Sequence, residues 1–286
     1  MIDAARRSRT AEGAALLRAL HRHVDAEPWV FTDSEVEALL PGPGRRFLQR
    51  LDALPRPWIA TFRSRRSALD AIRAQIVARS RYAEDALASL GASQYLVLAA
   101  GLDTFALRHA SESVQVFEVD HPATQSWKRG RLARAPENLS FVPIDFERAT
   151  LAEALTATEL DAQPPTFVSW LGTTYYLSRN AIAETLRGVR ERTGPGSRLV
   201  LDYWTEAPLA DARASALLFG TRLATALSSE PIKTLFTPAE MEALAVRTGW
   251  RVREHLAPVI QNARYFAARS DGLAVPSFAY LIQLER

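Results

Sequence analysis

The spacing of hydrophobic residues divides the chain into two parts. Up to about residue 90, apolar residues recur at helical spacing, as in Ala11–Val24 and Ser67–Leu90, and no strand-like run interrupts them. From Gln94 onward, short apolar runs of strand length alternate with stretches that suit helices. The runs are Tyr95–Ala99, Val114–Val119, Leu139–Ile144, Thr166–Trp170, Leu199–Tyr203, Arg251–Leu256 and Phe278–Leu284. This alternation predicts an α/β fold with a doubly wound, mainly parallel sheet of seven strands.

The same pattern predicts how the chain is organised. We expect residues 1–90 to form a helical N-terminal cap and residues 91–286 to form the sheet domain. Within the sheet domain, residues 205–235 have no strand pattern and predict a helical insertion. Thr237 and Pro238, followed by Glu240, are typical of the capped start of a further helix.

Composition narrows the classes of function. The chain has 286 residues and a formal net charge of +3, and without a dense basic tract it gives no indication of a nucleic-acid partner. No run approaches the ~20 apolar residues of a membrane span, so we expect a cytoplasmic protein that does not bind membranes. The absence of cysteine excludes disulfides and thiolate metal sites, and no histidine pair has zinc-binding spacing. A G-x-S-x-G motif is also missing, which argues against an α/β-hydrolase. The sequence does not indicate an oligomeric state.

The most informative segment is QYLVLAAGLDTFALRHASESVQVFEVD, residues 94–120. It predicts a buried strand, a tight turn at Gly101, a short helix and a second strand that ends in acids. Doubly wound folds use such a unit to hold a nucleoside cofactor, with a carboxylate after the second strand on the ribose. Glu118 and Asp120 point the same way along a strand. Glu118 follows Gly101 at roughly the ~20 residues expected for the ribose-binding acid. The single glycine alone leaves a plain strand-to-helix turn equally open.

Three other places offer candidate site residues. Asp145 and Phe146 close the third run, and a carboxylate beside an aromatic ring suits a purine. Trp170 and the TTYYL segment after it follow the fourth run, where ligands of doubly wound sheets lie, although core packing is the alternative for these aromatics. Arg79 and Arg81 precede the first strand; either could bind a carboxylate or pair with an acid on its own helix.

Together these segments resemble the leucine carboxyl methyltransferase family, which are class I S-adenosylmethionine-dependent methyltransferases and include polyketide-type bacterial O-methyltransferases. The resemblance rests on ARSRYAEDAL at 78–87, LVLAAGLDTFALR at 96–108, VFEVDHPATQSWKR at 116–129, FVPIDFE at 141–147, FVSWLGTTYYLS at 167–178 and YFAARSDGL at 265–273. It implies a Rossmann-like methyltransferase domain with S-adenosyl-L-methionine as cofactor.

The resemblance also implies roles at the methionine end of the cofactor. Arg79, with Arg81 as second choice, would bind the methionine carboxylate. The turn around Gly101 and Asp103 would wrap the methionine part, and Arg108 would be structural or would pair with Asp103.

At the nucleoside end, Glu118 would hold the ribose hydroxyls, and Asp145 with Phe146 would recognise adenine. The full set that we expect at the cofactor is Arg79, Ala99, Gly101, Asp103, Glu118, Val119, Asp145, Phe146 and Trp170. Tyr175 and Tyr176 are expected in the substrate pocket.

Two positions depart from the family pattern. Ala99 stands where the family usually has glycine, and Leu171 stands where it commonly has glutamate, so no role is assigned to Leu171.

The function implied by the resemblance is methyl transfer to a carboxylate or hydroxyl of a small molecule. The alternatives are methylation of a protein C-terminal carboxylate and a catalytically silent cofactor-binding protein. A carboxylate acceptor needs no general base; for a hydroxyl, His121 and Tyr176 are the candidate bases. No catalytic residue and no metal ligand is assigned.

Overall fold

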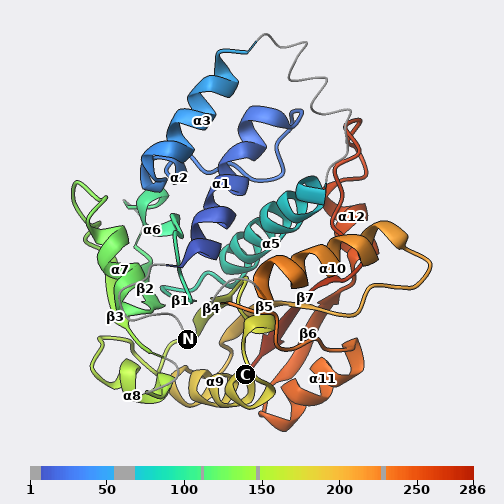
Figure 1. Cartoon of the computed structure of the whole chain (residues 1–286). Coiled ribbons are helices and arrows are strands. Elements are labelled where there is room, and N and C mark those ends of the chain that lie inside the picture. The colour runs from blue at the N-terminus through green and yellow to red at the C-terminus, as the bar shows by residue number, and fades with distance from the viewer. Residues whose placement is uncertain (1–7, 55–67, 111–112, 146–148, 227–229) are drawn as a thin grey trace.

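A seven-stranded sheet forms the centre of the computed structural model, which describes residues 8–54, 68–110, 113–145, 149–226 and 230–286 (Figure 1). The strands are β1 (Gln94–Leu98), β2 (Gln115–Asp120), β3 (Leu139–Pro143), β4 (Thr166–Trp170), β5 (Arg198–Trp204), β6 (Arg251–Leu256) and β7 (Ala279–Glu285). Their order is β3-β2-β1-β4-β5-β7-β6, and β7 alone runs antiparallel to its neighbours. The predicted fold class is therefore confirmed, and the strand order reverses between β1 and β4.

Helices cover both faces of the sheet because β1 and its neighbours bury apolar side chains on both sides. Leu96 and Leu98 lie on the sheet face that is covered by α8 (Leu151–Thr156), α9 (Arg179–Arg192) and α11 (Pro238–Arg247). Tyr95 and Val97 point to the other face, which α5 (Ala68–Leu90), α6 (Phe105–Arg108) and α12 (Pro258–Tyr265) cover. The alternation follows from the two-residue period of a strand.

The N-terminal helices form a separate small core beside the turn that follows β1. They are α1 (Arg9–Val24), α2 (Val36–Leu39) and α3 (Gly42–Asp52). Their buried leucines and alanines enclose Leu102 of that turn. Helix α3 begins at Gly42 and includes Pro43, because a proline in the first helical turn loses no hydrogen bond.

Local sequence signals set several helix boundaries. Thr150 and Thr237 each form a capping box, with Glu153 and Glu240 as the reciprocal partners.

Within the insertion expected at residues 205–235, the only described helix is α10 (Ala212–Ala226), and the described flanks are irregular. The remaining elements are α7 (Pro122–Arg129) and the short 3₁₀ helix η1 (Thr174–Tyr176). None of the helices in the described ranges has both the length and the apolar character needed to cross a bilayer.

Candidate functional site

A large cavity lies beyond the carboxyl ends of β1, β2 and β4. Its volume is about 1580 Å³, whereas pockets for one drug-sized ligand measure about 300–1,000 Å³. We call the part formed by the turn Ala99–Asp103, Asp120 and Arg79 the strand-side half. The part formed by the starts of α5 and α12 and by α10 is the helix-side half. The cavity has room for two ligands, and its strand-side half lies where doubly wound sheets bind cofactors.

The turn after β1 is tight and is pressed from outside by α1. Ala99 and Gly101 have φ angles of 52° and 53°, in the left-handed region that favours glycine. A Cβ on Gly101 would lie 3.1 Å from the Cβ of Ala11. Both its φ angle and this tight contact therefore favour glycine at position 101, while Ala99 adopts a similar φ angle as a non-glycine residue at some cost.

Glu118 lies beneath this turn and not on the cavity wall. It is 1% exposed, and its Oε2 atom accepts a hydrogen bond from Nζ of Lys128 at 2.5 Å. Lys128 also donates to the carbonyl oxygen of Asp103 at 2.6 Å, so the pair supports the turn. The pKa of Glu118 is raised to about 7, because the effect of burial exceeds the opposing effect of the Lys128 charge. The Oε1 atom of Glu118 is buried without a hydrogen-bond partner among the described residues.

Asp120 is the acid of β2 that reaches the cavity. It accepts hydrogen bonds from the backbone N–H groups of Gly101 and His121, at 2.5 and 2.6 Å. Burial raises the pKa of Asp120, and these two hydrogen bonds oppose that rise. Glu118, the acid that sequence spacing favoured, lies deeper, while Asp120, the last residue of the strand, lines the cavity.

Arg79 spans from α5 to the fifth strand. Its Nη1 atom donates to Asp202 at 2.8 Å and to the Tyr175 hydroxyl at 3.3 Å. Burial alone would lower the pKa of Arg79, but the charge of Asp202 outweighs this, and the pKa lies above its usual value. In the described part of the chain, Nε and Nη2 make no hydrogen bond, which leaves them available to a ligand. Gly172, with φ 79°, lets this guanidinium lie close: a Cβ there would be 2.6 Å from Nη2.

Arg81, the second-choice arginine, is exposed and pairs with Asp85 on the same helix at 2.8 Å. Asp202 was missed by sequence reasoning. Its signal is a single carboxylate inside the apolar run LVLDYW, because an isolated buried acid needs a partner.

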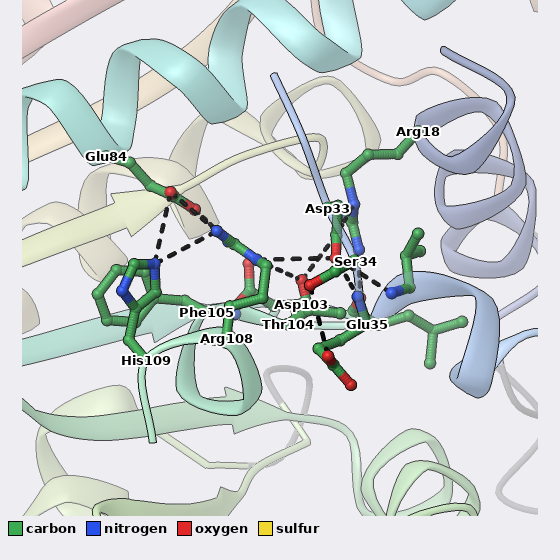
Figure 2. Close-up of polar contacts among 12 residues, drawn as sticks. Arg18, Asp33, Ser34, Glu35, Glu84, Asp103, Thr104, Phe105, Arg108 and His109 are labelled. Carbon is green, nitrogen blue, oxygen red and sulfur yellow. Dashed lines mark hydrogen bonds and ion pairs between the residues drawn. The ribbon is translucent and has the colours of Figure 1, made fainter. Parts of the chain in front are cut away.

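Ion pairs tie the N-terminal helices to the turn after β1 (Figure 2). Arg108 pairs with Glu84, and its Nε atom lies 3.7 Å from Asp33. Asp33 also accepts from Thr104 and from Arg18, both at 2.6 Å. Arg18 in turn donates to the carbonyl oxygen of Leu102 at 2.6 Å. Arg108 is thus structural.

The other expected site residues divide into two groups. Asp145, Tyr175 and Tyr176 line the cavity, together with Arg79, Ala99, Gly101 and Asp103. Val119 and Trp170 are fully buried in the core on the α8–α9 face and do not line it. Phe146 lies outside the described residues. No metal-binding group of three or more His, Asp or Glu side chains occurs in the ranges that the structure describes.

The surroundings of His121 and Tyr176 disfavour the role of base for both side chains. The Nδ1 atom of His121 accepts a hydrogen bond from the N–H of Ala123 at 3.2 Å, which places the proton of the neutral ring on Nε2. Burial raises the pKa of Tyr176 above its usual range, so its hydroxyl keeps its proton at neutral pH.

Comparison with known proteins identifies related sequences. The leucine carboxyl methyltransferase family model matches residues 11–190. The chain is 39% identical over 207 residues to the Bacillus subtilis (strain 168) protein named "Putative S-adenosyl-L-methionine-dependent methyltransferase YktD", covering 69% of the chain and 68% of YktD. A Mycobacterium avium (strain 104) protein named "Putative S-adenosyl-L-methionine-dependent methyltransferase" is 32% identical over 205 residues, covering 65% of the chain and 62% of that protein. The matched segment thus spans about two thirds of these relatives.

Two solved structures share the fold along nearly the whole chain. A DUF574 family protein from Streptomyces avermitilis is 18% identical with a TM-score of 0.57, covering 96% of this chain and 97% of that one. A protein from Thermobifida fusca described as a "putative methyltransferase" is 17% identical with a TM-score of 0.58, covering 94% and 97%.

The family match includes Arg79, the turn after β1 and Asp120, the residues that shape the strand-side half of the cavity. The chain therefore belongs to the leucine carboxyl methyltransferase family and is a methyltransferase that uses S-adenosyl-L-methionine.

Proposed function

We propose that this enzyme transfers the methyl group of S-adenosyl-L-methionine to an ionised oxygen of a small molecule, with a carboxylate favoured over a hydroxyl. The observation that carries this proposal is the hydrogen bond from the Ala123 N–H to Nδ1 of His121, which occupies a ring nitrogen of one of the two candidate bases. The other candidate, Tyr176, has its pKa raised by burial, which disfavours the tyrosinate that would act as the base. A carboxylate is ionised at neutral pH and needs no base, whereas a hydroxyl does.

The strand-side half fits the cofactor at both ends. We assign the methionine carboxylate to Arg79, because its Nε and Nη2 atoms remain available while Asp202 fixes the guanidinium. We assign the ribose hydroxyls to Asp120 in place of Glu118, because Asp120 lines the cavity. Asp145 remains the candidate for the adenine amine.

The bound cofactor supplies a methyl group already activated by its positive sulfur. The chain has to hold the acceptor oxygen in line with that methyl group at near-attack distance. The turn Ala99–Asp103 is suited to this, because Lys128 and two residues of α1, Arg18 and Ala11, contact it. The fixed turn limits the motion of the donor, and the adjoining helix-side half is left to place the acceptor.

The proposal is tested by binding and product assays on the same preparation. We expect S-adenosylhomocysteine to bind in isothermal titration calorimetry, and labelled cofactor to methylate carboxylic acids in a panel that also holds phenols and a peptide ending in leucine. A methyl ester releases methanol in mild base and a methyl ether does not, so the bond can be identified. Methylation of the phenols alone, or of the peptide alone, would contradict the proposal.

A further inference from the structure

Apolar side chains dominate the helix-side half of the cavity. They include Leu69, Ile72, Leu217, Val259 and Val275, and Gly220 lines the same half with its backbone. They come from the starts of α5 and α12, from α10, and from the segment before β7 (Figure 1). This half therefore offers apolar area and few directed hydrogen bonds to a ligand.

Helix α10 presents apolar residues that the protein itself does not bury. Its sequence, ARASALLFGTRLATA, is rich in apolar residues, yet only Ala214 and Leu218 are buried. Leu69 and Val259, at 61% and 72% exposure, line the cavity as well, so they mark its mouth. An apolar ligand between these elements would cover the area that folding leaves exposed.

The two aspartates of this half are already engaged by other residues. Asp70 pairs with Arg73 at 3.0 Å, and Asp211 accepts from the Ser277 hydroxyl at 2.7 Å. Arg213 and Lys233 are exposed at the cavity rim. A peptide backbone held here would need hydrogen-bond partners from a lining that is mostly apolar, and each polar group buried without one is costly.

We propose that the acceptor is an extended, largely apolar small molecule that carries its reacting oxygen at one end. Its hydrocarbon or aromatic body lies between α10 and the starts of α5 and α12, and reaches the mouth at Leu69 and Val259. The inference rests on the proposed methyl transfer but concerns the other half of the cavity.

The first test measures how affinity depends on chain length. Straight-chain carboxylic acids of four to twelve carbons, and 4-alkylphenols with matching chains, are titrated into enzyme saturated with S-adenosylhomocysteine. We expect the Kd to fall by about 3- to 4-fold for each added CH₂ until the chain fills the cavity. Titration of S-adenosylhomocysteine alone reports separately on the cofactor site, so failure of the proposed function and failure of this inference can be distinguished.

The second test changes the length at which the affinity gain stops. A Cβ on Gly220 meets open space, and the residue lines the cavity. We expect Gly220→Leu to shorten the longest chain that still gains affinity by about two to three carbons, with S-adenosylhomocysteine binding unchanged. Gly220→Ala, which adds one methyl group, is the matched control and should move this limit by one carbon at most.

Three results would overturn the inference. The first is a Kd that does not change with chain length. The second is that Gly220→Leu does not change the longest chain that still gains affinity. The third is tight binding of the peptide ending in leucine with no binding of the acids or phenols. In each case intact S-adenosylhomocysteine binding shows that the enzyme is folded and that its cofactor site works.

Discussion

The two halves of the cavity are built on different principles. In the strand-side half and directly behind it, charged groups are held by specific partners: Arg79 by Asp202, Lys128 by Glu118, and Arg18 by Asp33. In the helix-side half, α10 buries only two of its residues and shows apolar side chains to the cavity and to solvent. The difference indicates a fixed cofactor site joined to an acceptor site that can change in sequence without disturbing the sheet.

The largest expected effect separates the two arginines of α5. Arg79→Met leaves Asp202 buried without its ion-pair partner, and we expect the free energy of unfolding to fall by about 3–5 kcal/mol, with loss of S-adenosylhomocysteine binding. Arg81→Met breaks only the exposed pair with Asp85 and should cost less than about 1 kcal/mol. Chemical denaturation and calorimetry provide the two measurements.

A partial substitution guards against failure of Arg79→Met to fold. Arg79→Lys keeps the positive charge near Asp202 but loses the second nitrogen that we assign to the ligand. We expect a folded protein with weakened cofactor binding. Equal cofactor affinities for the Arg79→Lys and Arg81→Met variants would remove Arg79 from the cofactor site.

The next effect separates the two acids of β2. Asp120→Asn should weaken S-adenosylhomocysteine binding by about 10- to 100-fold, the ~1.5–3 kcal/mol of a hydrogen bond to a charged group. Glu118→Gln should change the affinity far less, because Glu118 does not line the cavity. Calorimetric titration of both variants provides the comparison, and the reverse ranking would return the ribose to Glu118.

A smaller effect is the pH dependence that Glu118 gives to stability. Its pKa is about 7 in the folded protein and 4.5 as a model value, so between these values the folded state binds more protons than the unfolded state. The contribution of Glu118 to the free energy of unfolding is therefore largest below pH 4.5 and is lost as the pH rises through 7. We expect a fall of about 2 kcal/mol between pH 5 and 8.

Glu118→Gln is the reference for this measurement, because all other titrating groups remain in both proteins. Denaturant titrations of wild type and variant at pH 5, 6, 7 and 8 should diverge with rising pH. Parallel curves would show that Lys128 compensates for the burial of Glu118 over the whole range.

The strands could be predicted because buried parallel strands appear as continuous apolar runs. The choice between Arg79 and Arg81 could not be made from local pattern. Two residues apart on a helix, they point to different sides, and only Asp202, more than 120 residues away, shows which one turns inward. Glu118 and Asp120 share one side of a strand, so periodicity could not show which acid reaches the cavity.

The helix-side half was the least predictable part. The start of α12 was not expected from the sequence, and α10 was expected only as part of a longer helical insertion. An apolar helix that faces a ligand has the same pattern as one that faces a core. The distinction depends on what the rest of the chain leaves uncovered, which is a property of the tertiary structure.

The smallest expected effect concerns Ala99, where the strand-side half departs from the family pattern. Its φ of 52° costs a non-glycine residue about 1–2 kcal/mol, while a glycine there costs about 0.5–1 kcal/mol in chain entropy. Ala99→Gly should therefore raise the free energy of unfolding by up to about 1 kcal/mol and leave S-adenosylhomocysteine affinity unchanged. The control is Ala100→Gly, because the φ angle of Ala100 is not positive. This substitution should lower the free energy of unfolding by about 0.5–1 kcal/mol, since glycine adds the same chain entropy to the unfolded state. If both substitutions destabilise the protein equally, the turn holds no strain at Ala99, and the alanine is an ordinary member of a turn that tolerates it. If only Ala99→Gly stabilises, the enzyme keeps a strained residue between the sheet and the cofactor site, and the cost is small because Lys128 and α1 already fix the turn on either side.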